Sequence, residues 1–141
     1  CFIGDGVILA NCATLAGHVH VGHNSVIGGL SAVHQFVQIG EHAFIGGKTG
    51  VAQDVPPFML VAGERAKVFG PNTIGLRRAG FSKEQISALK KAYQILWRSG
   101  LSQKLALKKI QSELGQIDVI QKFIQFVQNS KRGLVSAQKD S

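Results

Sequence analysis

Five histidines are the side chains of this sequence best suited to acid–base chemistry near neutral pH, and all of them lie within the first 42 residues. The sequence contains no Ser-His-Asp pattern, phosphate loop or dinucleotide fingerprint, so the histidines are the remaining candidates for a reactive centre. His18 and His34 are the strongest pair. Gly17 precedes the first and Gln35 follows the second, which would let a substrate approach closely.

The other histidines allow two further interpretations. We expect His20 and His42 to be ordinary solvated side chains on an outer surface. His18 and His23 form an H-x4-H spacing, which with a third histidine from elsewhere could hold zinc. This metal-enzyme alternative is weaker, because the spacing is short and few carboxylates are available to orient the ligands.

Charge is divided unevenly along the chain. The net charge of +8 combines −2 for residues 1–56, where one lysine faces three acidic residues, with +10 for residues 57–141. No nucleic-acid recognition motif accompanies the basic residues, so we expect them to form a solvated face or to dock an acidic protein or a phosphorylated ligand. The basic residues of the helical part are Arg77, Arg78, Lys83, Lys90, Lys91, Arg98, Lys104, Lys108 and Lys109.

A six-residue repeat must position the histidines. From Ile3 the chain reads as nine hexapeptides, in which the first residue is always aliphatic and the second is Gly or Ala in all but one. This period predicts a parallel β-helix whose short strands stack coil upon coil. If three hexapeptides make one triangular coil, as in the hexapeptide-repeat proteins that this pattern resembles, residues 3–56 make three coils, and His18 and His34 are expected near one corner on adjacent coils, ~5–8 Å apart. The repeats are IGDGVI, LANCAT, LAGHVH, VGHNSV, IGGLSA, VHQFVQ, IGEHAF, IGGKTG and VAQDVP.

The repeat changes after residue 56. We assign residues 1–56 to the β-helix, which we expect to have lost earlier coils, because it begins in mid-register at Cys1. Pro56-Pro57 is expected to end the strand ladder, since proline donates no backbone hydrogen bond. Residues 57–81 are assigned to an extended and looped connection.

Residues 82–141 are predicted to form a small three-helix domain. Ser82 and Gln85 form a capping box before a helix that ends at Gly100. Ser102 is expected to cap a second helix and Asp118 a third, and we expect a frayed tail after Lys131.

The composition places the chain among soluble, cytosolic globular proteins. Hydrophobic residues make up 45% and charged residues 17% of the sequence, which excludes a disordered segment. No apolar run is long enough for a membrane span. Two cysteines, Cys1 and Cys12, provide neither a disulfide framework nor a four-ligand metal site, and we expect them to be reduced.

Four segments before the helical end resemble the UDP-N-acetylglucosamine 3-O-acyltransferase family of lipid A biosynthesis. The resemblance covers nearly the whole chain and implies a homotrimer of left-handed β-helices with active sites between neighbouring subunits. It implies transfer of an (R)-3-hydroxyacyl chain from acyl carrier protein to the 3-hydroxyl of UDP-N-acetylglucosamine, in the cytoplasm and without metal or cofactor. The segments are LAGHVHVG, IGGLSAVHQFVQIG, GVAQDVPPFML and GLRRAGFS.

The resemblance also implies roles for matching residues. Gly17 matches the position whose backbone N–H faces the thioester oxyanion, and His18 matches a histidine of the site. Family residues that contact the nucleotide sugar match His34 and Gln35, and a residue near the pantetheine arm matches Gly29.

Three further residues match positions of the family, and at three positions this sequence differs from it. Gly47 matches the small residue that leaves room for a long acyl chain to extend past it. Asn72 and Arg78 match positions that bind the nucleotide diphosphate. The family's general base is a histidine followed by aspartate before the position of Cys1, and is absent here. The other departures are Ile74, where an acidic residue is frequent, and Ala79, where a second arginine is frequent.

Two other functions remain open on the sequence. One is the related N-acyltransferase that acts later in the same pathway, which the VHQF segment and the helical end disfavour. The other is a non-catalytic trimeric scaffold, which only the missing general base favours.

Overall fold

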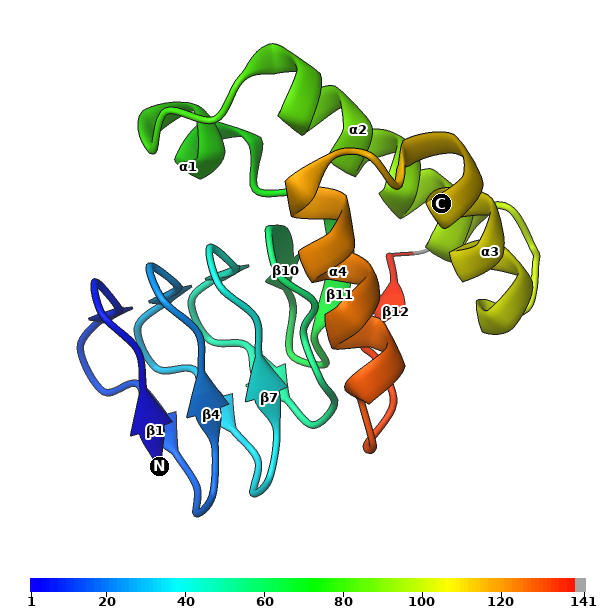
Figure 1. Cartoon of the computed structure of the whole chain (residues 1–141). Helices are drawn as coiled ribbons and strands as arrows, with labels where there is room; N and C mark the ends of the chain where they lie inside the picture. The colour runs from blue at the N-terminus through cyan, green and yellow to red at the C-terminus, as the bar shows by residue number, and fades with distance from the viewer. Residues whose placement is uncertain (139–141) are drawn as a thin grey trace.

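Residues 2–51 form a stack of three β-helical coils, as the six-residue period predicts. The computed structural model describes residues 1–138, and each hexapeptide in this stretch contributes one two-residue strand (Figure 1). The second residue of each strand is the aliphatic one, and it points into the core; Val21, Ile27 and Val33 are at most 2% exposed. The strands are β1 (Phe2–Ile3), β2 (Ile8–Leu9), β3 (Thr14–Leu15), β4 (His20–Val21), β5 (Val26–Ile27), β6 (Ala32–Val33), β7 (Gln38–Ile39), β8 (Phe44–Ile45) and β9 (Gly50–Val51).

The strands line up in three parallel sheets, which are the faces of a triangular prism. One face holds β1, β4 and β7, the second β2, β5 and β8, and the third β3, β6 and β9. Partners are one coil apart, as when Phe2 pairs with His20. Side chains eighteen residues apart are therefore stacked directly on one another.

Tight turns form three corners between these faces. The first corner holds residues 5–6, 23–24 and 41–42, the second holds residues 11–12, 29–30 and 47–48, and the third holds residues 17–18 and 35–36. The later residue of each turn is left-handed, with φ of 60° at His18 and 68° at Phe36. That conformation costs about 1–2 kcal/mol for a residue with a side chain. Hydrogen bonds between coils offset the cost, for example from the Phe36 N–H to the Gly17 carbonyl at 3.0 Å.

The expectation that Pro56-Pro57 ends the ladder is wrong. The chain turns a corner at Phe58, whose N–H donates to the Glu41 carbonyl, and then re-enters the second face as β10 (Met59–Ala62). β10 pairs in parallel with β8, and β11 (Lys67–Pro71) pairs with β10 in antiparallel fashion. The prolines remove donors only at their own positions, so the strands beyond them still pair.

The helices gather at the end of the stack opposite the N-terminus (Figure 1). Ser82 and Gln85 form the predicted capping box, and Ser102 caps the next helix through the Leu105 N–H. Asp118 does not cap the last helix: Ile117 occupies the N-cap position, and Asp118 is the first helical residue. The elements are α1 (Thr73–Arg78), expected only as loop, α2 (Lys83–Tyr93), the π-helical turn η1 (Gln94–Arg98), α3 (Gln103–Leu114) and α4 (Asp118–Asn129).

The tail was expected to fray after Lys131, and this is wrong for the part that the structure describes. β12 (Ser136–Ala137) pairs with β11, and Val135 is buried and accepts a hydrogen bond from Trp97 Nε1 at 3.0 Å. The expectation for residues 139–141 lies outside the described residues. No helix within residues 1–138 is both long and apolar enough to cross a membrane.

Candidate active site

The third corner gathers four of the residues singled out in the sequence: Gly17, His18, His34 and Gln35. The imidazole of His18 stacks on the ring of Phe36, with centroids 4.7 Å apart. A Cβ placed on Gly17 would lie 3.4 Å from Gln35 Nε2, so the absence of a side chain at Gly17 leaves the corner open. An open groove of about 460 Å³ runs beside this corner and is lined in part by His34, Gln35 and Phe36.

Gly17 presents an unused hydrogen-bond donor at this corner. Its carbonyl accepts from the Phe36 N–H, but no group within residues 1–138 accepts from the Gly17 N–H. Gly17 is exposed, so a ligand can reach this N–H. A fixed backbone donor of this kind can stabilise an oxyanion that develops during acyl transfer.

The second corner carries the predicted glycine pair as a strip of bare backbone. A Cβ on Gly47 would meet the Gly29 carbonyl at 3.4 Å, and a Cβ on Gly29 would meet the Asn11 carbonyl at 3.2 Å. The two glycines therefore lie one above the other, on adjacent coils. With no side chains in the way, an extended chain could lie close along this strip.

Asn72 and Arg78 belong to a third location, a groove of about 830 Å³ on the second face. Its apolar wall includes Val26, Phe44 and Leu60, and α1 forms the opposite side. Asn72 is buried and its Nδ2 donates to the His42 carbonyl at 3.3 Å. The exposed guanidinium of Arg78 has no carboxylate within salt-bridge distance in the described chain, so the groove combines an apolar wall with an unpaired cation.

His42 is a functional candidate that the sequence analysis missed, because we expected it to be solvated. It is half-buried in the same groove, with its ring 4.9 Å from that of Phe81 and Nε2 3.5 Å from Asn24 Nδ2. Burial lowers the pKa of His42, the nearby Glu41 opposes this and Lys122 adds to it. The sequence signal that could have indicated its contact with Asn24 is that His42 lies eighteen residues, or one coil, further along the chain. Phe81, which covers His42, lies outside the repeat. His20 is exposed, as expected.

The histidine pair considered for zinc does not converge. His18 lies at the third corner and His23 at the first, where the His23 Nδ1 accepts from the Asp5 N–H at 2.8 Å. No group of three histidine, cysteine, aspartate or glutamate residues suited to a metal occurs within residues 1–138. The geometry of the described residues therefore does not support a zinc site that contains both His18 and His23.

The predicted site residues thus form three groups on different sides of one prism. The corner with Gly17 and His34 joins the third and first faces, the glycine strip with Gly29 and Gly47 lies at the corner that joins the second and third faces, and the groove with Asn72 and Arg78 lies on the second face. A single chain brings each group together but does not unite the three.

Comparison with known proteins gives a consistent result. Residues 54–135 match the sequence model of UDP N-acetylglucosamine O-acyltransferase, domain 2. The chain is 54% identical over 134 residues to the acyl-(acyl-carrier-protein)–UDP-N-acetylglucosamine O-acyltransferase of Thermodesulfovibrio yellowstonii, covering 95% of this chain and 52% of that protein. It is 49% identical over 139 residues to the protein of the same name from Burkholderia ambifaria, covering 96% and 53%.

Solved structures show the same likeness. LpxA from Acinetobacter baumannii superimposes with a TM-score of 0.92 at 40% identity, over 96% of this chain and 53% of that one. The UDP-N-acetylglucosamine acyltransferase of Arabidopsis gives a TM-score of 0.92 at 40% identity, over 96% and 51%. The chain spans about half the length of the curated relatives it matches.

Proposed function

Because the chain belongs to the UDP-N-acetylglucosamine O-acyltransferase family, we propose that it forms part of an enzyme that transfers an (R)-3-hydroxyacyl chain. The donor is acyl carrier protein and the acceptor is the 3-hydroxyl of UDP-N-acetylglucosamine. The observation that carries this proposal is the N–H of the exposed Gly17, which has no acceptor within residues 1–138 and lies beside His18, His34 and Gln35 at one corner.

In the proposed reaction, the sugar hydroxyl oxygen attacks the thioester carbonyl. A C–O bond forms and the C–S bond breaks, and the hydroxyl proton ends on the pantetheine thiol. The Gly17 N–H would stabilise the negative charge that develops on the carbonyl oxygen. His34 and Gln35 would hold the sugar, and His18 would line the reacting centre. The family's His-Asp base lies outside this chain and would take this proton from the hydroxyl and pass it to the leaving thiolate.

The other two groups have proposed roles that fit their chemistry. The strip at Gly29 and Gly47 would accommodate the pantetheine arm and the acyl chain, because it offers backbone without side-chain obstruction. The groove with Asn72 and Arg78 would bind the nucleotide diphosphate, since an unpaired guanidinium binds phosphate well. Ile74, at 66% exposure, leaves this groove without an acidic side chain at that position.

A homotrimer would unite these groups. Since one chain carries the corner with His34 and the groove with Arg78 on different sides of the prism, a complete site would need the corner of one subunit opposite the groove of its neighbour. Three coils alone also bury little apolar area, which favours association. We therefore propose active sites between subunits.

The helical part would recruit acyl carrier protein in the cytoplasm. The lysines at 83, 90, 91, 104, 108 and 109 are all exposed, so they can attract an acidic partner. Both cysteines are exposed free thiols, which suits a reducing compartment.

Mixing two inactive variants tests the function and the shared site together. His34→Ala and Arg78→Ala are prepared in the protein that carries this chain together with the family's His-Asp pair. Each alone should transfer acyl chains to UDP-N-acetylglucosamine poorly. Co-expressed, they should regain part of the activity, because some interfaces then hold both wild-type residues. No recovery would contradict a shared site, and an inactive wild-type protein would contradict the enzymatic proposal.

A further inference from the structure

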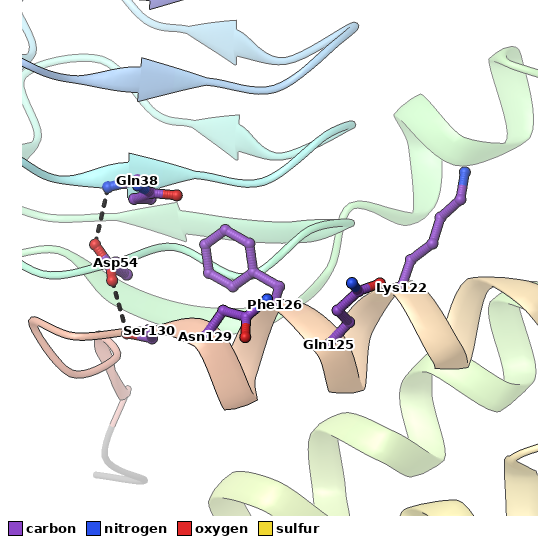
Figure 2. A pocket seen from close by; sticks show the side chains of 7 residues that line it. All are labelled: Gln38, Asp54, Lys122, Gln125, Phe126, Asn129 and Ser130. Atoms are coloured by element: carbon purple, nitrogen blue, oxygen red, sulfur yellow. Dashed lines mark hydrogen bonds between the residues drawn. The ribbon is translucent and has the colours of Figure 1, made fainter.

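The segment after α4 is fixed to the β-helix by a buried carboxylate. Asp54 is 1% exposed, and its two oxygens accept from the Gln38 N–H at 2.8 Å and from Ser130 Oγ at 2.6 Å. Figure 2 shows Asp54 between these two partners, with α4 running beside the strands. The backbone of Asp54 adds two bonds, donating to the Gly133 carbonyl at 2.9 Å and accepting from the Val135 N–H at 3.0 Å. Residues 130–135 are therefore held in one path against the prism.

This path carries Arg132 to the third corner. Its Nε and Nη2 both donate to the Ala52 carbonyl, at 3.2 and 2.9 Å. Ala52 lies one coil beyond His34, whose N–H donates to the Val51 carbonyl. Arg132 consequently lines the same 460 Å³ groove as His34 and Gln35.

The guanidinium of Arg132 still has hydrogen-bond donors that these contacts do not use. One carbonyl occupies two of its donors, and no carboxylate within residues 1–138 lies at salt-bridge distance from it. The side chain is exposed to the groove, while its orientation is set by the Ala52 carbonyl. A planar guanidinium with free donors and no counter-charge is suited to a phosphoryl group.

We propose that Arg132 binds a phosphoryl group of a substrate at the corner formed by Gly17, His34 and Gln35, and that Asp54 and Ser130 are its positioning residues. The inference rests on the proposed function, which brings two phosphorylated molecules to this corner. One is the diphosphate of the sugar nucleotide, and the other is the phosphodiester of the pantetheine arm. Both molecules carry a phosphoryl group that Arg132 can bind. The experiment therefore tests binding of each molecule separately.

The test measures binding by calorimetry in the protein that carries this chain with the family's His-Asp pair. The probes are UDP-N-acetylglucosamine and (R)-3-hydroxyacyl-4′-phosphopantetheine. Arg132→Gln removes the charge but keeps an amide that can donate to the Ala52 carbonyl, and Lys131→Gln removes the same charge from the neighbouring residue as a matched control. Arg132→Gln should bind one probe about tenfold or more weakly, as expected for the loss of a charged hydrogen bond. Lys131→Gln should bind both probes as the wild type does.

The positioning role has a separate readout. Ser130→Ala should raise KM for the same substrate with kcat little changed, and should add little in an Arg132→Gln background, because both changes affect one contact. Equal affinities of Arg132→Gln and Lys131→Gln for both probes would overturn the inference while leaving the proposed function intact. A wild-type protein that binds neither probe would instead contradict the proposed function, and the inference with it.

Discussion

The imidazole of His18 lies face to face on the phenyl ring of Phe36, one coil further along, with ring planes 6° from parallel. The pair arises because the two residues occupy the same left-handed turn position in successive coils, so the β-helix stacks them. Phe36 thereby limits the orientations open to the imidazole.

Removing this ring should slow the proposed reaction. Phe36→Ala is expected to lower kcat about two- to tenfold, corresponding to the ~0.5–1.5 kcal/mol of an aromatic pair. Phe69→Ala serves as control, because it removes an exposed phenyl ring on β11, away from this corner. Identical steady-state rates for the two variants would show that the stacking does not support His18.

The bond between Ser130 and Asp54 should be measurable as stability. Ser130→Ala removes one hydrogen bond to a buried carboxylate and should lower the free energy of unfolding by about 1.5–3 kcal/mol. Urea denaturation measures the difference, with Ser112→Ala, an exposed serine on α3, as control. A midpoint for Ser130→Ala equal to that of the control would mean that the carboxylate gains nothing from this bond.

His42 should make stability depend on pH. Because burial lowers its pKa in the folded protein below the ordinary 6.5, the unfolded chain takes up this proton first as the pH falls. The stability that the neutral His42 side chain contributes is fully present above pH 6.5. This stability is lost as the pH falls from 6.5 through the pKa of His42 in the folded protein. Thermal unfolding between pH 8 and pH 5 should therefore show a shallower decline for His42→Gln than for the wild type.

A second variant checks the cause of that shift. Lys122 Nζ lies 3.1 Å from Glu41 Oε1, and the charge of Lys122 lowers the pKa of His42. Lys122→Met should therefore raise the pKa of His42 and reduce the pH dependence of the stability. Parallel stability curves for His42→Gln and the wild type would exclude His42 as the responsible group.

Charge reversal on α2 should weaken binding of the carrier protein and spare the nucleotide. Lys90 and Lys91 are exposed, so Lys90→Glu with Lys91→Glu should lower affinity for acyl carrier protein, most strongly at low salt. Arg98 is unsuitable for reversal, because its Nε donates to the Tyr93 hydroxyl at 3.1 Å and supports packing. The double Lys→Arg variant keeps the charge and should bind the carrier normally.

Arg78→Ala should show the opposite pattern. Loss of a charged contact to phosphate is expected to weaken UDP-N-acetylglucosamine binding about 10- to 100-fold and to leave carrier binding nearly unchanged. Calorimetric titrations of both variants with both molecules measure this difference. If the two variants weakened both ligands equally, the proposed division between helices and groove would be wrong.

The sequence by itself determined the β-helix and its register. An aliphatic residue at every sixth position predicts short stacked strands that face one narrow core, and three hexapeptides to a coil, which the resemblance implies, then stack residues eighteen apart, as the structure shows for Phe2 and His20. The caps at Ser82 and Ser102 were equally predictable, because each depends on residues only three apart.

Tertiary structure decided what depends on contacts between distant segments. Residues 130–135 are held against the β-helix because Asp54 binds Ser130, 76 residues later, and His42 is half-buried because Phe81 covers it from outside the repeat. Local patterns carry no information about such partners, so the sequence predicted a frayed end and a solvated histidine. It also could not place Asn72 and Arg78, because their groove forms where α1 and β10, which lie outside the repeat, meet the second face.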